Sequence, residues 1–484
     1  MENGRLRTTV DHRSPETAKN PCLKQTVTPT GQTLGMASTY GATNTVKSAD
    51  TLTRVNELIA EGLAFAGESA HKRYFNRTVD ELVDLDGELA AGSAERRPHE
   101  LLEASTLTRL SALWESGWQP FDVAHVVRRA CNPRVAHLAI CAMRAELQQS
   151  GRVSLAPASW LSQLASLQAT LPHTQLSRLE SCPFDPMDAP FAAWQRADRL
   201  STADLLEDAL LLLSTIRFLQ PLSILMDPPS RWNANSVPPN PAESAAQDRK
   251  VASEKMLATV RALLAKAEGT NYPAEAEAFA AKAQELMTRY SIDAAMLDDR
   301  HGDALAAGVR AQRFHLEQPY AKEKVSLLSV VGSANRVRIV FQDAYAIAHA
   351  VGFEEDLEVT DLLYTSLLVQ ASRAITSTTA VAGRSSRASS PAFRRAFWLA
   401  YANRIGERLE EAQERAQSES QSTYGSALVP LLQERSDAVT ARVDEMFGKL
   451  RQMKSRRLDA EGWFAGRDAA ESASLAVANG RLNR

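Results

Sequence analysis

Apolar side chains recur every three or four residues along most of the chain, and this spacing limits the fold more than any other feature. The clearest stripe in the first half consists of Leu205, Leu206, Ala209, Leu212, Leu213 and Ile216. Residues at these intervals lie on one face of an α-helix. Looser stripes of the same kind begin near Thr53. We therefore predict a mainly α protein in which residues 51–226 form a helical N-terminal domain.

Two segments interrupt this pattern. Residues 227–247 hold five of the 21 prolines in a polar stretch, and such clusters favour extended linkers. Residues 1–50 are rich in small polar side chains and lack apolar periodicity. A segment of that kind buries too little surface to offset the entropy lost on ordering. We predict a linker at 227–247 and a disordered segment at 1–50.

A helical hairpin is predicted over residues 248–300. Its first helix carries an apolar face made of Met256, Leu257, Val260, Leu263, Leu264 and Ala267. Pro273 then begins a second helix, because a proline at the first helical position loses no hydrogen bond. Acidic Glu275 and Glu277 follow in its first turn, where the helix dipole favours negative charge.

The period changes after residue 300, and a small α+β module is predicted over residues 301–383. Its elements follow the order β-α-β-β-α, with a mainly antiparallel sheet. The predicted strands are Val309–Leu316, Arg336–Phe341 and Tyr345–Phe353, and the predicted helices are Tyr320–Ser333 and Asp356–Ile375. C-terminal helices are predicted within 384–460, at Phe393–Gln417 and Leu431–Lys454, followed by a flexible tail at 461–484.

Composition excludes several classes of protein. The formal charge of −3 excludes a uniformly basic nucleic-acid coat. No segment approaches the about 20 consecutive apolar residues that span a bilayer, and no apolar core of a secretory signal is present. We expect a cytoplasmic protein without membrane contact. The four cysteines form no Cys-x-x-Cys pair, and we expect free thiols.

The hairpin sequence resembles a known family. Lys255 to Glu268 supply a basic, leucine-containing first helix, and Asn271-Tyr272-Pro273-Ala274-Glu275-Ala276-Glu277 supplies the turn. Ala283-Gln284-Glu285-Leu286-Met287 then leads to Tyr290-Ser291-Ile292. This pattern closely resembles the bacterial domain-of-unknown-function family 2786. The resemblance implies a shared fold, and it implies no activity because the family has no established one.

The flanking segments resemble the longer proteins that carry this domain, to about residue 475. The resembling segments are Gly117-Trp118-Gln119-Pro120, Arg128-Arg129, Leu363 to Leu368, Phe393-Arg394, and the pair Gly462 and Gly466. Many relatives carry a further glycine after that pair. This chain departs from them with Asp468-Ala469-Ala470.

Signatures of familiar enzymes are absent from the sequence. It has no phosphate-binding Gly-x-x-x-x-Gly-Lys-Ser/Thr loop, no dinucleotide fingerprint, no His-Glu-x-x-His and no Gly-x-Ser-x-Gly. We predict no catalytic residues and no cofactor, although an enzyme without such motifs stays an alternative.

Two residue sets resemble metal ligands, and we predict no metal site at either. The first is His125, Cys131, His137 and Cys141, whose spacing matches no common zinc module, so helix packing is preferred. The second is Asp298, Asp299, His301 and Asp303, for which a solvated turn is preferred.

Charge distribution is the most informative functional signal. No acidic residue lies between Asp361 and Glu407, a segment that carries six arginines, Arg373, Arg384, Arg387, Arg394, Arg395 and Arg404. A second acid-free run between Glu445 and Asp459 holds Lys449, Arg451, Lys454, Arg456 and Arg457. Guanidinium groups pair with phosphate oxygens, and each contact releases counterions. Apart from Arg373, these residues are the candidate nucleic-acid contacts.

Two weaker observations qualify this hypothesis. Aromatic Phe393, Phe397 and Tyr401 repeat every four residues, which is more typical of a core stripe than of a base-stacking platform. The arginines could instead pair with an acidic segment such as Glu354-Glu355-Asp356. Our leading hypothesis is a non-enzymatic protein that binds DNA or RNA. The main alternative is a protein-interaction scaffold that uses the hairpin and the N-terminal helices.

Overall fold

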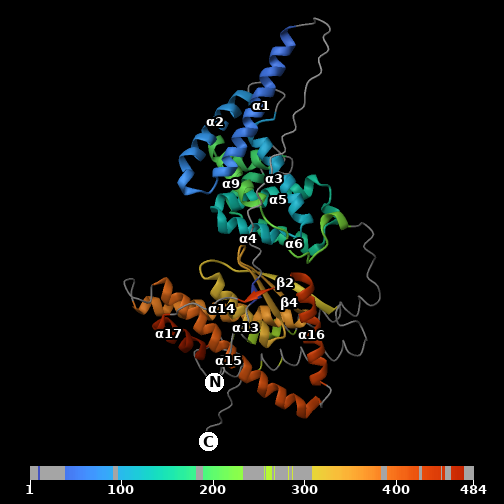
Figure 1. Ribbon diagram of the computed structural model, residues 1–484, viewed down its shortest axis with the longest axis vertical. Coiled ribbons are helices and arrows are strands. Elements are labelled where there is room, and N and C mark those ends of the chain that lie inside the picture. Colours follow the sequence, from blue (N-terminus) through green and yellow to red (C-terminus); the bar gives the residue numbers. More distant parts are fainter. Residues whose placement is uncertain are drawn as a thin grey trace. The chain divides into compact units, whose positions relative to one another are not determined.

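The structure of the chain is a computed structural model. It describes most of the segments for which helices and strands are predicted. The described residues are 9–10, 39–90, 96–180, 189–232, 256, 258–263, 266, 282, 286, 308–382, 390–424, 428–448, 450–452 and 459–473. The chain divides into two compact units. Unit 1 comprises Met1–Arg13 with Val237–Arg484, and unit 2 comprises Ser14–Ser236. The labels used below are those of Figure 1.

Unit 2 is helical throughout its described part. Its α-helices are α1 (Thr39–Phe65), α2 (Lys72–Ala90), α3 (Pro98–Glu115), α4 (Pro120–Ala130), α5 (Pro133–Gln149), α6 (Ala158–Gln168), α7 (His173–Glu180), α8 (Pro190–Asp198) and α9 (Thr202–Arg217). Short 3₁₀ helices lie at η1 (Ser69–His71), η2 (Val153–Leu155) and η3 (Pro229–Arg231). Four of the helices begin with proline at the first helical position, namely α3, α4, α5 and α8.

The apolar stripe of α9 forms the centre of unit 2. All six of its predicted core side chains are buried, and α9 contacts helices that surround it, including α2, α3 and α5. Buried ion pairs also tie this helix to its neighbours. The carboxylate of Asp208, which is completely buried, accepts bonds from Nε and Nη2 of Arg134 on α5 at 2.5 and 3.0 Å. The prediction that this part of the chain is mainly α-helical is thus confirmed.

Unit 1 contains the predicted α+β module. Its elements are β1 (Thr9–Val10), β2 (Val309–His315), α13 (Ala321–Ala334), β3 (Arg338–Gln342), β4 (Ile347–Phe353), α14 (Glu354–Ala382), α15 (Pro391–Tyr424), α16 (Leu428–Phe447), β5 (Arg451–Gln452) and α17 (Ala460–Glu471). The β-α-β-β-α order is confirmed by β2, α13, β3, β4 and α14. The mainly α fold class with a small α+β module is therefore correct.

The sheet of unit 1 has the order β2-β4-β3-β1-β5. Strand β4 pairs antiparallel with both β2 and β3, which confirms a mainly antiparallel sheet. The two-residue β1 adds parallel to β3, and β5 then pairs antiparallel with β1. One face of the sheet packs against α13, α14 and α15 through a cluster that includes Phe314, Ile339 and Phe341. The other face packs against α16 through Val340, Val351 and neighbouring residues.

The N-terminal segment and the linker differ from prediction at their described residues. Disorder was expected over 1–50, but Thr9–Val10 forms β1 and α1 begins at Thr39. The backbone groups of β1 are satisfied by strands far along the chain, and α1 extends backwards because each added residue gains one helical hydrogen bond. The linker was expected from 227, yet Pro229 and Trp232 are buried against unit 2. The ring of Trp232 meets that of Trp160 edge to face at 5.2 Å.

Two predictions for the C-terminal part of the chain also differ from the structure, namely the end of α16 and the flexible tail. Helix α16 ends at Phe447 rather than at Lys454, because Gly448 adopts a left-handed conformation with φ of +62° and β5 follows. The flexible tail expected at 461–484 is wrong for 461–471, which belong to α17. Of the predicted hairpin, 258–263 are helical and Val260 is fully buried. Most of 248–300 lies outside the described residues.

Candidate nucleic-acid interface

The first basic run continues into the beginning of α15. Ser390 caps this helix, and its Oγ accepts a hydrogen bond from the N–H of Phe393 at 3.1 Å. The first turn holds no acidic residue. Arg394 is half-buried and Arg395 is exposed. The N-terminus of α15 therefore carries two arginines beside the positive end of the helix dipole. The dipole disfavours positive side chains at this position, so it does not explain why they are there.

The aromatic residues of α15 belong to the core. Phe393, Phe397 and Tyr401 are at most 1% exposed, and the rings of Phe397 and Tyr401 stack at 6.2 Å. Burial raises the pKa of Tyr401 well above its ordinary value. The core-stripe interpretation of this spacing is confirmed, and these rings are not available for stacking with bases.

Helix α17 packs along α15 through two glycines. A Cβ atom added at Gly462 would lie 2.3 Å from the carbonyl oxygen of Phe393, and one added at Gly466 would lie 2.3 Å from that of Phe397. Each position accepts only glycine without a shift of the backbone. Contacts advance in the same direction along both helices, so α15 and α17 run parallel with their N-termini side by side.

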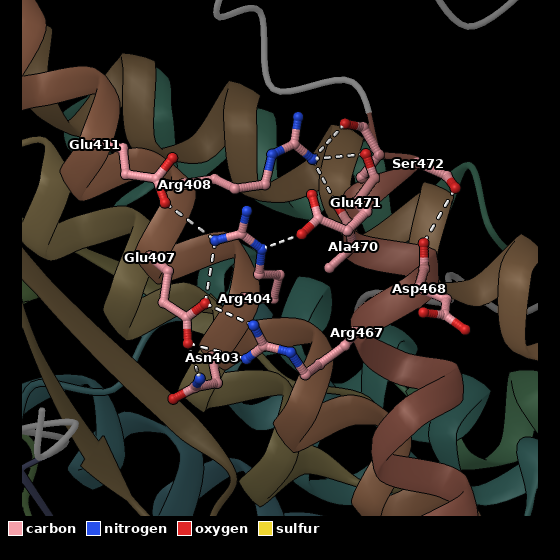
Figure 2. Close-up of polar contacts among 11 residues, drawn as sticks. Asn403, Arg404, Glu407, Arg408, Glu411, Arg467, Asp468, Ala470, Glu471 and Ser472 are labelled. Carbon is pink, nitrogen blue, oxygen red and sulfur yellow. Dashed lines mark hydrogen bonds and ion pairs between the residues drawn. The ribbon is translucent and has the colours of Figure 1, made fainter. Parts of the chain in front are cut away.

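Ion pairs hold the other end of this helix pair in register (Figure 2). Arg467 of α17 donates two hydrogen bonds of 3.0 Å to the carboxylate of Glu407 on α15. Arg404 of α15 bonds Glu471 of α17, and also Glu407 and Glu411 on its own helix. The hydrogen bond from Arg404 lowers the pKa of Glu471, although burial opposes this.

An arginine of α15 also caps the C-terminus of α17. Nη1 of Arg408 donates to the carbonyl oxygens of Ala470 and Glu471 at the end of α17 (Figure 2), and to that of Ala473 just beyond it. Burial lowers the pKa of Arg408, and the nearby carboxylate of Glu471 opposes that change. The cap explains why α17 ends in contact with α15.

The acidic segment that could have neutralised the basic runs has other partners. Asp356, at the start of α14, accepts a hydrogen bond from Arg336 at 2.8 Å. Glu355 accepts one from Arg435 at 2.8 Å, and Arg435 is 1% exposed with its guanidinium 3.7 Å from the Phe353 ring. The described partners of this segment therefore come from the turn between α13 and β3 and from α16, not from the basic runs.

The predicted site residues have different fates in the structure. Arg394 and Arg395 lie at the beginning of α15, whereas Arg404 is 16% exposed and faces three carboxylates. Arg451 belongs to β5. The other predicted residues, Arg384, Arg387, Lys449, Lys454, Arg456 and Arg457, lie outside the described residues.

The parallel packing nevertheless relates the two basic runs. Asp459 caps α17 by accepting a hydrogen bond from the N–H of Gly462 at 3.0 Å, and Gly462 touches Phe393. Arg456 and Arg457 precede Asp459 by three and two residues, a chain length of at most about 7 to 11 Å. Of the described residues, Arg394 and Arg395 of the first run therefore lie at the same end of the pair as the cap of α17. Sequence reasoning missed this arrangement, although the Gly-x-x-x-Gly spacing of α17 was its visible signal.

The candidate metal ligands of unit 2 have separate surroundings. The Cys131 thiol lies 3.3 Å from the Thr215 hydroxyl, while the ring of His137 meets Trp194 at 6.0 Å. Burial raises the pKa of Cys141 to about 12. Within the described residues, no three His, Cys, Asp or Glu side chains form a group that could hold a metal ion. The second candidate set, within residues 298–303, lies outside the described residues. Among the helices that the structure describes, none is long and apolar enough to cross a bilayer.

Comparison with known proteins gives one result. Residues 255–294 match the model of the family described as Protein of unknown function (DUF2786). No curated protein and no solved structure matches the chain. The chain thus contains a DUF2786-like domain at residues 255–294.

Proposed function

We propose that this protein binds nucleic acid at the N-terminal end of the α15–α17 pair. The supporting observation is the parallel packing of the two helices, which sets the N-terminus of α15 beside that of α17, the helix that the second basic run precedes in the sequence. Arg394 and Arg395 lie there on α15, and Arg456 and Arg457 immediately precede the cap of α17. Arg404 is not part of the proposed surface, because its guanidinium is already paired with carboxylates.

The physical basis is the electrostatics of this end. Two parallel helices direct their unpaired N–H groups and positive dipole ends toward the same side, and phosphate oxygens are favoured at such positions. Arginine adds bidentate hydrogen bonds to phosphate. A polyanion would also gain entropy from counterion release. Binding of this kind needs no enzymatic group.

The test compares two exposed arginines of unit 1 in the full-length protein. Arg395→Ala removes a residue of the proposed surface, and Arg442→Ala removes one from α16, where Arg442 pairs with Glu445 at 2.6 Å. Binding of labelled duplex DNA and RNA is measured by fluorescence anisotropy at several salt concentrations. We expect Arg395→Ala to weaken binding about three- to tenfold and to reduce the salt slope by about 1, and Arg442→Ala to do neither.

A second variant extends the test to the other basic run. The triple change Lys454→Ala, Arg456→Ala and Arg457→Ala should flatten the salt dependence further. Binding that ignores salt, or equal losses for Arg395→Ala and Arg442→Ala, contradicts the proposal. Recovery of a stoichiometric protein partner without any nucleic-acid binding would favour the scaffold alternative instead.

A further inference from the structure

One lysine of unit 1 lies at the beginning of a helix. Lys324 is the fourth residue of α13, and its N–H donates the first hydrogen bond of the helix, to the carbonyl oxygen of Tyr320 at 2.9 Å. The N–H groups of the residues before it have no acceptor in a preceding turn, so they form the positive end of the helix dipole. A lysine in this first turn is therefore placed where its positive charge is disfavoured.

The side chain of Lys324 turns back toward this end of the helix. Its Nζ donates to the carbonyl oxygen of Glu317 at 2.9 Å, and Glu317 precedes α13 in the chain. The Cα–Cβ bonds of a helix tilt toward its N-terminus, which lets a long side chain reach the preceding segment. The ammonium group is thus held near the positive end of the dipole and is not directed away from it.

An indole ring lies against Lys324. The centre of the Trp398 ring of α15 is 5.9 Å from Nζ, and Trp398 is 3% exposed. This distance is close to the outer limit of a cation–π contact, so the ring attracts the ammonium only weakly. It also displaces water from that side of the group, and Lys324 is half-buried.

Lys324 lacks the counter-ion that a neighbouring lysine has. Within the described residues Lys324 forms no ion pair, whereas the ammonium of Lys322 pairs with the carboxylate of Asp343. Burial lowers the pKa of Lys324, although the nearby carboxylate of Glu317 opposes this change. At a given pH, a larger share of Lys324 therefore carries a neutral amine than an exposed lysine would.

We propose that Lys324 is a modification site that accepts acyl groups from activated carboxylic acids, namely acyl phosphates or acyl thioesters. The neutral Nζ keeps one N–H on the carbonyl oxygen of Glu317 and uses its lone pair to attack the acyl carbon. A C–N bond forms while the C–O bond to phosphate, or the C–S bond to the thiol, breaks. The leaving group takes the electron pair of the broken bond, and one amine proton passes to water.

The product of this reaction suits the same position. Acylated lysine retains one N–H, which can donate to the carbonyl oxygen of Glu317 in place of the ammonium. The side chain loses its charge, so its unfavourable interaction with the dipole of α13 disappears. Acylation of Lys322 would instead break the ion pair with Asp343. The two lysines therefore differ in what modification costs the fold.

The experiment measures the acetylation rates of both lysines in the full-length wild-type protein. One arm uses acetyl phosphate and the other uses acetyl-coenzyme A, and mass spectrometry quantifies the modified peptides over time. The side chain of Lys322 is 51% exposed, so accessibility alone predicts that Lys322 reacts faster. We expect Lys324 to react about three- to tenfold faster than Lys322, because attack requires a neutral amine.

Two variants test the electrostatic argument. Glu317→Gln removes the carboxylate that favours the charged form of Lys324, so it should accelerate acetylation of Lys324 about twofold. Asp343→Asn releases Lys322 from its ion pair, so it should accelerate Lys322 and leave Lys324 unchanged. Circular dichroism checks that both variants keep the wild-type fold.

The comparison of the two lysines is made within one molecule, so a folding defect cannot produce the expected order. Faster labelling of Lys324 in either arm supports the proposal and identifies the class of acyl donor. Equal rates for the two lysines, or faster labelling of Lys322, with both donors would overturn it. No nucleic acid is present in the experiment, so the result is independent of the proposed α15–α17 surface.

Discussion

At the scale of single residues, arginine is used in several different ways in this protein. Arg408 caps a helix C-terminus, and Arg435 lies buried over an aromatic ring against Glu355. Arg404 faces three carboxylates, whereas Arg395 is exposed. The same residue type therefore serves stability in some places and is available to a ligand in others. The neighbouring side chains in the fold determine which of these two roles each arginine has.

Glu103 of α3 offers a test of how burial acts on a single charge. Burial raises the pKa of Glu103 from its ordinary value of 4.5 to about 6, although its carboxylate accepts a 2.8 Å hydrogen bond from the N–H of Phe191. The folded state thus binds more protons than the unfolded state between these values. Stability attributable to Glu103 is present at low pH and is lost as pH rises through about 6.

We expect Glu103→Gln to be more favourable at pH 8 than at pH 4, because the amide keeps the acceptor and removes the buried charge. The free energy of unfolding, relative to wild type, should increase by about 1 to 2 kcal/mol between these pH values. Urea unfolding at several pH values measures it. A difference that does not change with pH would show that Glu103 carries no burial cost.

At the scale of elements, the important event is the docking of α17 on α15. Gly462 and Gly466 allow the two backbones to touch, and Arg404, Arg408 and Arg467 fix the register. The next position of the same face, four residues after Gly466, is Ala470, which is fully buried. A methyl group is accepted there at the end of the contact. Two glycines are thus sufficient for close packing.

Gly466→Ala should disrupt this docking. The added Cβ would meet the Phe397 carbonyl oxygen, and overpacking of this kind costs about 2 to 3 kcal/mol. The thermal unfolding midpoint of the full-length protein measures the loss. Gly87→Ala on α2 is the control, because no atom lies within 4 Å of its added Cβ. It should be neutral or stabilise by up to about 1 kcal/mol, and equal losses for both variants would contradict the docking argument.

At the scale of the whole molecule, unit 1 is built from two segments of the chain that are separated in sequence by unit 2. Unit 1 takes its strand β1 from residues that precede unit 2 in the sequence. Unit 2 in turn extends beyond α9 as far as Trp232. Ser230 donates to Glu115 from both its hydroxyl, at 2.6 Å, and its N–H, at 2.9 Å. The boundary of unit 2 is therefore set by contacts, not by the first prolines of the linker.

Fragments of unit 2 test this boundary. A fragment of residues 39–236 should unfold at a temperature roughly 10 °C higher than a fragment of residues 39–226. The shorter one loses the packing of Trp232 on Trp160, and loss of a buried tryptophan costs about 3 to 5 kcal/mol. Circular dichroism measures the two midpoints. Trp232→Ala in the longer fragment should lower its midpoint nearly to that of the shorter one, and identical midpoints for the two fragments would argue against this boundary.

Local patterns in the sequence were sufficient for much of the fold. The stripe of α9 and the β-α-β-β-α order were predicted from residue spacing, because neighbours in sequence determine which side chains share a face. The buried aromatic stripe of α15 was predicted in the same way. The metal-like set of unit 2 had matching residue types but no matching spacing, and the fold keeps its members in separate surroundings.

Contacts between distant segments were decided only by the tertiary structure. The sequence could show an acid-free run containing Arg404, but Glu471 lies 67 residues away and pairs with it only because α17 docks in parallel on α15. The chain after α9 is likewise held by Arg109 of α3, which donates to the carbonyl oxygen of Leu219, 110 residues later in the chain. Periodicity is a local property, so the sequence by itself determined the elements and their buried faces. Which charges are neutralised, and which end of a helix pair gathers positive charge, depends on long-range packing that spacing does not encode.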